Sequence, residues 1–169
     1  MFANSKLIEI KNLPQSSVGA PLPSLLSSER NLFLLYYLQN TPENWDGKTV
    51  RMVDVGTTES VGIINFAPYS AYKFGPPSDE TIRGHPLYKS GLKPYSFFEV
   101  EKSEWIETLE KMNSVHPHHK KERFQTLKHY IFTFHDSTFE CVARSYELEI
   151  KDGPMSEVYK AYAHRLISE

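Results

Sequence analysis

The chain has 169 residues, of which 40% are hydrophobic, and its formal net charge is −2, from 19 Lys and Arg against 21 Asp and Glu. This length is typical of one domain with its own core. The balanced charge argues against nucleic acid as a partner, and the single cysteine, Cys141, excludes an internal disulfide. The longest apolar run, 32–38, is too short to cross a bilayer, and the N-terminus lacks a signal-like apolar stretch. We therefore expect a cytoplasmic protein without a membrane partner.

The chain has 10 Phe, 10 Tyr, 2 Trp and 11 Pro, a composition that favours strands and turns over a helical bundle. Residues 6–10 predict a short strand, and the Pro- and Ser-rich segment 12–28 predicts an extended surface tether. Residues 32–38 are apolar on both faces, which is typical of a central strand. The β-rich runs 50–55 and 61–66 predict a hairpin.

The second half of the chain alternates between loops, strands and helices. Residues 76–94 show no periodicity, and loops of this length are often functional. Residues 95–100 predict a strand. Ser103 is a suitable N-cap for a helix over 103–113 that covers a sheet, and an apolar stripe predicts a second helix over 154–167.

The clearest element is a hairpin formed by 129–135 and 138–144. Its predicted register places Phe134 opposite Phe139 and Phe132 opposite Cys141, so that one face belongs to the core. We expect the phenylalanines on this face to point toward the helices. Cys141 alternates with apolar residues on the same face and is expected to be buried rather than nucleophilic.

The opposite face of the hairpin is mixed. In the predicted register Thr133 lies opposite Glu140 and His129 lies opposite Arg144, while His135 is diagonal to Glu140. The candidate ligand-binding residues lie on this face or in the 76–94 loop that we expect to fold over it: His85, Tyr88, His129, His135, Glu140 and Arg144. Three of them, His85, His135 and Glu140, are candidate metal ligands, and His135 and Glu140 are alternatively a general acid/base pair. The alternative is the solvated side of a half-exposed sheet with ordinary cross-strand pairs.

A basic segment precedes the hairpin. It begins with a His-x-His-x3-Glu pattern at 116–122, but an intervening proline and adjacent lysines argue against a cupin-type metal strand. Its four cations could contact phosphate or an acidic partner, although such groups are more often an ordinary solvated face: Lys120, Lys121, Arg123 and Lys128.

Three strings in the second half of the chain carry a resemblance. Arg-Gly-His-Pro-Leu-Tyr at 83–88, Asn-Ser-Val-His-Pro at 113–117 and the run from His129 to Cys141 are similar to those of a group of small bacterial proteins of unknown function. The resemblance covers about two thirds of the chain. It implies a bacterial origin and no activity, and no site residues follow from it.

The predicted fold is therefore α+β, with a mostly antiparallel sheet of about six to eight strands, bent or partly closed into a barrel, and two packed helices. No phosphate-binding loop, hydrolase elbow or dinucleotide motif is present, and no cofactor follows from the sequence. The first functional hypothesis is a binding domain for a small molecule, a protein or a second copy of the chain. The second is a metal-binding protein or enzyme that uses the mixed hairpin face under the 76–94 loop.

Overall fold

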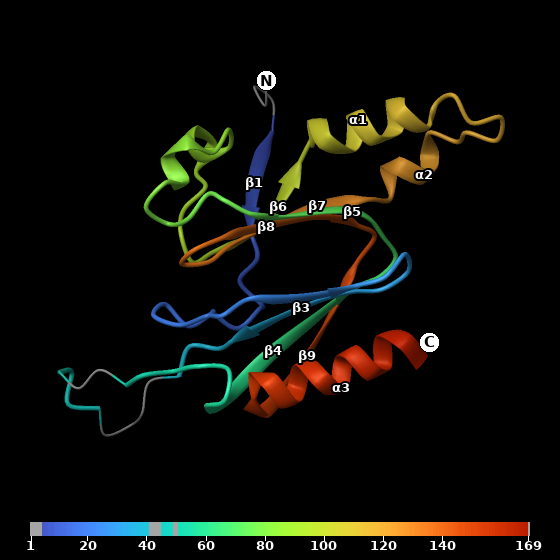
Figure 1. Cartoon of the computed structure of the whole chain (residues 1–169). Coiled ribbons are helices and arrows are strands. Elements are labelled where there is room, and N and C mark those ends of the chain that lie inside the picture. The colour runs from blue at the N-terminus through green and yellow to red at the C-terminus, as the bar shows by residue number, and fades with distance from the viewer. Residues whose placement is uncertain (1–4, 41–44, 49–50, 169) are drawn as a thin grey trace. The chain divides into compact units, whose positions relative to one another are not determined.

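Figure 1 shows the computed structural model of the chain, which describes residues 5–40, 45–48 and 51–168. Within this part, the strands form two antiparallel sheets with the orders β1-β6-β7-β8-β5 and β2-β3-β4-β9. Two compact units can be distinguished. The first contains the described residues up to Leu13 together with Phe66–Tyr146, and the second contains the described parts of Pro14–Asn65 and Glu147–Glu169.

The α+β class is confirmed, but the single barrel-like sheet of six to eight strands is wrong. The hairpin expected from 50–55 and 61–66 is not formed. Val50 lies outside the described residues, and residues 51–54 have no strand structure. The strand that contains 61–66 pairs instead with β3 and β9, which builds a second ladder separate from the five-stranded sheet.

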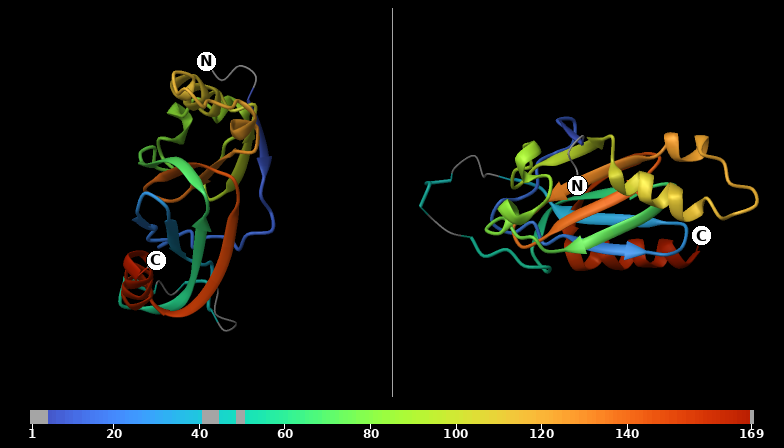
Figure 2. Two further views of the ribbon diagram at one scale, coloured as in Figure 1. Left: turned by 90° about the vertical axis from the view of Figure 1, so that its right-hand side faces the viewer. Right: turned by 90° about the horizontal axis from the view of Figure 1, so that it is seen from above.

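The first unit contains the five-stranded sheet and the segments that cover its outer face. Its strands are β1 (Lys6–Glu9), β5 (Tyr69–Gly75), β6 (Phe97–Glu101), β7 (Lys128–Thr133) and β8 (Thr138–Ala143). Its helices are η1 (Ile82–Gly84), η2 (Tyr88–Ser90), α1 (Glu104–Asn113) and α2 (Glu122–Gln125). Figures 1 and 2 show the two 3-10 helices and α1 on the same side of this sheet. The strands predicted at 6–10 and 95–100 and the helix predicted at 103–113 are thus present.

The register of the β7–β8 hairpin differs from the prediction by two residues. Phe132 lies opposite Phe139 and Thr133 opposite Thr138, while the N–H of Phe134 donates to the carbonyl of Ser137 at the hairpin end. A shift of two residues leaves every side chain on its predicted face. The face of the sheet opposite α1 and the 3-10 helices, here called the inner face, is aromatic as expected. Phe66 packs there against Phe132 and Phe139 with ring centroids 5.8 and 5.3 Å away.

The expectation that Phe132 points toward the helices is wrong. Its ring packs 4.4 Å from that of Phe97 on the inner face, whereas α1 lies over the other face of the sheet, where Trp105 meets His129. Cys141 is fully buried as predicted, and burial raises the pKa of its thiol. The burial of Cys141 confirms that this residue belongs to the core.

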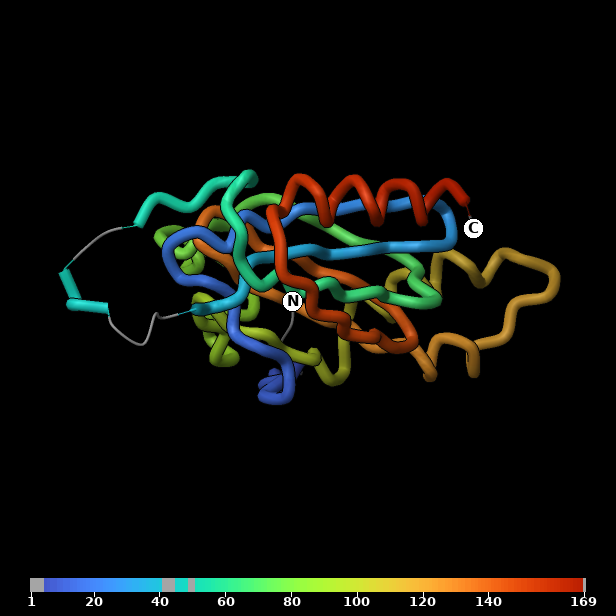
Figure 3. Tube along the Cα trace, turned by 90° about the horizontal axis from the view of Figure 1, so that it is seen from below, coloured from blue at the N-terminus to red at the C-terminus, as the bar shows by residue number. Residues whose placement is uncertain are grey.

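The second unit is a four-stranded sheet with one helix packed on it. Its elements are β2 (Ser24–Ser27), β3 (Leu32–Tyr37), β4 (Thr58–Phe66), β9 (Tyr146–Pro154) and α3 (Met155–Ser168). Figure 3 shows α3, in red, running along this sheet. Its apolar stripe is buried against β3, where the ring of Tyr162 meets that of Phe33 edge-on at 5.3 Å.

Most predictions for the second unit hold. Every residue of β3 is buried, which confirms the central strand predicted at 32–38, and α3 confirms the C-terminal helix. The segment 12–28 is not only a tether, because it contains β2 and a bridge from Ser16 to Leu38.

No helix in the described part of the chain has both the length and the apolar character needed to cross a bilayer.

Candidate functional site

The 76–94 loop folds over the outer face of the five-stranded sheet, as predicted. Its apolar side chains are buried there with side chains of β6 and β7, in a cluster of Ile82, Leu87, Leu92, Phe98, Val100 and Ile131. Two hydrogen bonds fix the loop to the hairpin: the N–H of Asp79 donates to the carbonyl of His135 at 2.8 Å, and the hydroxyl of Thr138 donates to the carbonyl of Pro77 at 2.9 Å. The outer face is therefore covered, and the interpretation as a solvated face is wrong for His129, which is 1% exposed.

Glu140 is the centre of the polar groups under this cover. Its two carboxylate oxygens face different histidines: Oε2 lies 2.9 Å from Nε2 of His129, and Oε1 lies 3.6 Å from Nε2 of His85. The ammonium of Lys73 is 3.8 Å from the same Oε1. Burial alone would raise the pKa of Glu140, but the contacts with His129, His85 and Lys73 together hold this pKa well below its usual range. Glu140 is therefore an ionised carboxylate that is hydrogen-bonded to His129, with the His85 imidazole nearby at ion-pair distance.

The second nitrogen of His129 contacts a serine. Nδ1 of His129 lies 2.8 Å from Oγ of Ser103, and the same Oγ accepts from the N–H of Ile106 at 3.4 Å as the N-cap of α1. A neutral imidazole that donates from Nε2 to the ionised Glu140 accepts at Nδ1 from the Ser103 hydroxyl. In this tautomer the hydrogen bonds run in one direction, from Ser103 through His129 to Glu140.

Trp105 covers this chain of hydrogen bonds. Its indole meets the ring of His129 edge-on at 5.1 Å, and the ammonium of Lys73 lies 3.9 Å from the centroid of the same indole. An ammonium above an indole is a favourable cation–π arrangement. Trp105 and Lys73 therefore hold His129 and Glu140 in place from the side of α1 and β5.

The backbone places Ser103 at a tight turn from strand to helix. β6 ends at Glu101, Lys102 has a left-handed φ of 54°, and Ser103 returns to extended geometry before α1 begins. A left-handed conformation is unfavourable for a lysine and is found where surrounding structure enforces it, often at functional sites. Ser103 is thus presented at the N-terminus of α1 by a strained turn.

A second polar cluster lies at the end of the hairpin. The hydroxyl of Tyr95 donates to Oδ2 of Asp79, and Nδ1 of His135 lies 2.9 Å from the same oxygen. Hydrogen bonds from Tyr95 and His135 lower the pKa of Asp79, and the bond to Asp79 raises the pKa of His135. Burial and the neighbouring Asp79 raise the pKa of Tyr95 to about 12. His135 is 44% exposed, so one face of its ring meets solvent.

The structure brings together only part of the predicted site. His85, His129 and Glu140 meet, but His135 contacts Asp79 instead, because the two-residue shift places His129 diagonal to Glu140. Tyr88 and Arg144 are exposed, and Arg144 does not lie opposite His129, whose partner in the ladder is Val142.

The predicted metal set of His85, His135 and Glu140 is not assembled. In the described part of the chain, no group of three or more His, Cys, Asp or Glu side chains is arranged to hold a metal ion. The imidazoles of His85 and His129 both face the single carboxylate of Glu140, His129 at 2.9 Å and His85 at 3.6 Å. This arrangement suits an ion-pair network.

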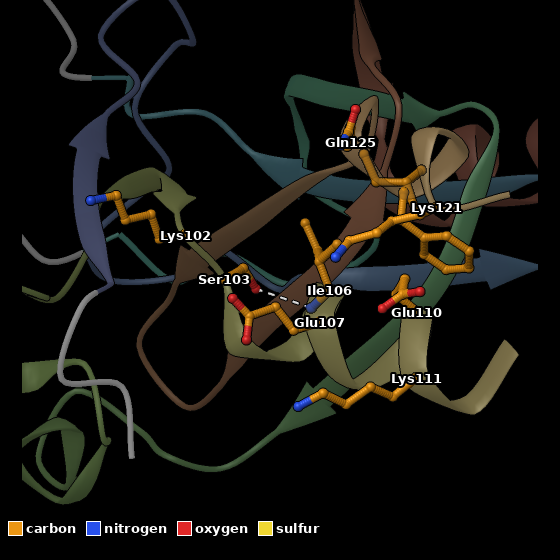
Figure 4. Close-up of a pocket in the computed structure, with 10 residues that line it drawn as sticks. Lys102, Ser103, Ile106, Glu107, Glu110, Lys111, Lys121 and Gln125 are labelled. Atoms are coloured by element: carbon orange, nitrogen blue, oxygen red, sulfur yellow. Dashed lines mark hydrogen bonds between the residues drawn. The ribbon is translucent and has the colours of Figure 1, made fainter. Parts of the chain in front are cut away.

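An open groove adjoins Ser103 between α1 and the segment around α2, and Figure 4 shows its lining. Its volume is about 580 Å³. Ile106, Phe124 and Leu127 supply apolar surface, and the charged or polar lining residues are Lys102, Ser103, Glu107, Glu110, Lys111, Lys121 and Gln125. In Figure 4 the side chain of Lys121 extends toward Ile106, whereas Lys102 and Lys111 extend to the periphery.

Sequence reasoning missed the groove and the residues that link Glu140 to it. From the sequence, Ser103 is predicted only as an N-cap, and Trp105 lies within the helix predicted over 103–113 without a role of its own. The spacing of polar residues within the hairpin could not indicate either role, because both side chains come from another element. Comparisons of the chain with protein-family models, with curated proteins and with solved structures give no match.

Proposed function

We propose that this chain is a small-molecule-binding domain whose site is the groove between α1 and α2, and that its ligand is an amphipathic anion. The observation that carries the proposal is the groove itself: about 580 Å³ of open space with apolar surface beside three lysines. Concave sites of 300 to 1,000 Å³ lined by apolar side chains and a few polar groups are typical of small-molecule binding.

The charge of the lining favours an anion. Lys102, Lys111 and Lys121 contribute three cations against the two carboxylates Glu107 and Glu110. Glu110 already has a partner, since its Oε1 lies 2.7 Å from Nε2 of His119. Lys121 is the cation that extends over the groove, so it is suited to pair with a carboxylate or phosphate while the apolar wall takes a hydrocarbon chain.

The test is isothermal titration calorimetry of the full chain with sodium decanoate and, separately, with neutral decyl glucoside. We expect decanoate to bind with a 1:1 stoichiometry and decyl glucoside to bind at least about tenfold more weakly, since an ion pair with Lys121 contributes on the order of 1.4 kcal/mol. The variant Lys121→Glu should lose this preference for the anion.

Lys89→Glu is the matched control, because Lys89 is also an exposed lysine of the first unit but lies in η2, outside the groove lining. It should bind decanoate as the unmodified chain does. Phe124→Asp should weaken the binding of both decanoate and decyl glucoside, because it places a charge in the apolar wall. Equal loss of decanoate binding in Lys89→Glu and Lys121→Glu, or no binding at all, would refute the groove as the site.

A further inference from the structure

The groove adjoins three hydrogen-bonded side chains, Ser103, His129 and Glu140, and this arrangement is not needed to bind an anion. Ser103 lines the groove, its Oγ is 2.8 Å from Nδ1 of His129, and Nε2 of His129 is 2.9 Å from Oε2 of Glu140. A hydroxyl, an imidazole and a carboxylate in this order are the parts of an activated serine nucleophile, which is recognised by geometry and not by position in the sequence.

We propose that Ser103 is the nucleophile of an acyl-transfer site at the wall of this groove, with His129 as its general base, and that the substrate is a carboxylic ester whose hydrolysis releases an amphipathic anion of the kind that the groove binds. This inference rests on the proposed function, because the groove holds the substrate. The base nitrogen here is Nδ1 and the nitrogen bound to the carboxylate is Nε2; either nitrogen of an imidazole can accept a proton while the other donates.

The surroundings of each group suit its role. Glu140 is enclosed by two imidazoles and Lys73, so its charge faces His129 and fixes the tautomer that accepts at Nδ1. His129 is 1% exposed and packs against Trp105, which holds the imidazole ring in one orientation. Ser103 lies at the positive end of the α1 dipole, where the N–H of Ile106 already points at its oxygen.

The strained turn provides an independent observation. A strand that leads through a left-handed residue into a helix places a side chain at the helix N-terminus in a sharp, strained turn, which is also the backbone setting of the nucleophile in many hydrolases, although Ser103 itself is 5% exposed. Lys102, with its φ of 54°, plays this part between β6 and α1. Ordinary helix capping by a serine does not require the preceding residue to be left-handed.

The reaction balances with water as the second reactant. The Oγ of Ser103 attacks the ester carbon and its proton passes to Nδ1 of His129, while the carbonyl electrons move to oxygen. Collapse of this intermediate breaks the bond to the alcohol, which leaves with the proton from Nδ1. Water then attacks the acyl-serine, gives one proton to Nδ1 and releases the carboxylic acid, and that proton restores the Ser103 hydroxyl. During both steps Glu140 stabilises the protonated imidazole.

The experiment treats the full chain with diisopropyl fluorophosphate and maps the adduct by mass spectrometry, and measures hydrolysis of p-nitrophenyl butyrate in parallel. We expect one adduct, on Ser103, and hydrolysis that falls about 100-fold or more in Ser103→Asn and His129→Gln, as is typical when a nucleophile or general base is lost. Asparagine is a good N-cap, so Ser103→Asn keeps the helix start.

Ser114→Ala is the matched control, because Ser114 follows the other end of α1, where its hydroxyl donates to the carbonyl of Lys111. It should react and hydrolyse as the unmodified chain does. Absence of an adduct on Ser103, or hydrolysis that is unchanged in Ser103→Asn or His129→Gln, overturns the proposal. Calorimetry with decanoate separates the two claims: if Ser103→Asn binds decanoate but the unmodified chain neither reacts nor hydrolyses, the acyl-transfer inference fails and the binding function stands.

Discussion

His129 and His135 lie on the same hairpin and each contacts a carboxylate, yet their surroundings are opposite. The side chain of His129 is 1% exposed, and both of its ring nitrogens have protein partners in Ser103 and Glu140. The side chain of His135 is 44% exposed, and its Nδ1 faces Asp79. The fold therefore holds the imidazole of His129 in one orientation. His129 connects a carboxylate to a hydroxyl in the groove wall, whereas His135 has an ion pair at the rim of the sheet.

Removing the carboxylate of Glu140 should have the largest effect on stability. Glu140→Ala leaves the buried N–H of His129 without its acceptor and removes the carboxylate that faces His85, so the free energy of unfolding should fall by about 3 kcal/mol. Urea denaturation followed by circular dichroism measures this change. The control is Glu99→Ala, which removes only a surface pair with Lys128 and should cost at most about 1 kcal/mol. Equal losses would show that Glu140 is not a structural centre.

The same carboxylate predicts a dependence on pH. The pKa of Glu140 is lowered in the folded state, so its contribution to stability is fully present above the ordinary pKa of a glutamate, about 4.3, and is lost as the pH falls below that value toward the folded pKa. The stability difference between the unmodified chain and Glu140→Gln should therefore shrink as the pH falls below about 4. A difference that grows in acid would contradict the ionised state of Glu140.

A smaller effect is expected at Thr133, on the same outer face. From the sequence alone, Thr133→Ala should cost far less than Phe132→Ala, because Thr133 was expected on the mixed face. In the structure Thr133 is 1% exposed, its hydroxyl donates to the carbonyl of Lys93 at 2.8 Å, and it accepts from the N–H of Ser96. The isosteric change Thr133→Val should therefore lower the free energy of unfolding by about 1 to 3 kcal/mol. An unchanged free energy of unfolding in urea denaturation would indicate that the Thr133 hydroxyl does not hold the end of the 76–94 loop.

The smallest effect should come from the exposed pair. NMR titration of the His135 ring should give a pKa above the ordinary histidine value, and Asp79→Asn should return it toward that value. Because the folded pKa of His135 is raised, the pair stabilises the fold at low pH and this contribution is lost as the pH rises through that pKa. Asp79→Asn should change stability less than Glu140→Ala, since His135 is partly solvated. An unchanged pKa of His135 in Asp79→Asn would refute the pairing.

The comparison also explains which parts of the site were predictable. Alternation along the hairpin placed His129 and Glu140 on one face, and the long aperiodic segment 76–94 indicated a cover that carries His85. The register was not predictable, because a shift of two residues leaves the apolar pattern unchanged. That shift decides whether Glu140 meets His129 or His135.

The groove and Ser103 were beyond the reach of local patterns for a different reason. Ser103 has the same signature as any N-cap, and its contact with His129 spans 26 residues. The groove depends on how α1 and α2 approach each other, which no periodicity within either helix determines. In the second unit, by contrast, the uninterrupted apolar run of β3 and the stripe of α3 were sufficient to predict a buried strand and a packed helix.

The most direct test of the central claim is to map the bound ligand by NMR. In a titration of the 15N-labelled chain with sodium decanoate, we predict that amide shifts change at the groove lining, in residues 102–111 and 121–127, and that the ring of His129 responds through Ser103. The amides around Asp79 and His135 should stay constant. Shift changes confined to the His135 rim, or to the second unit, would contradict the account, as would a spectrum that decanoate leaves unaltered.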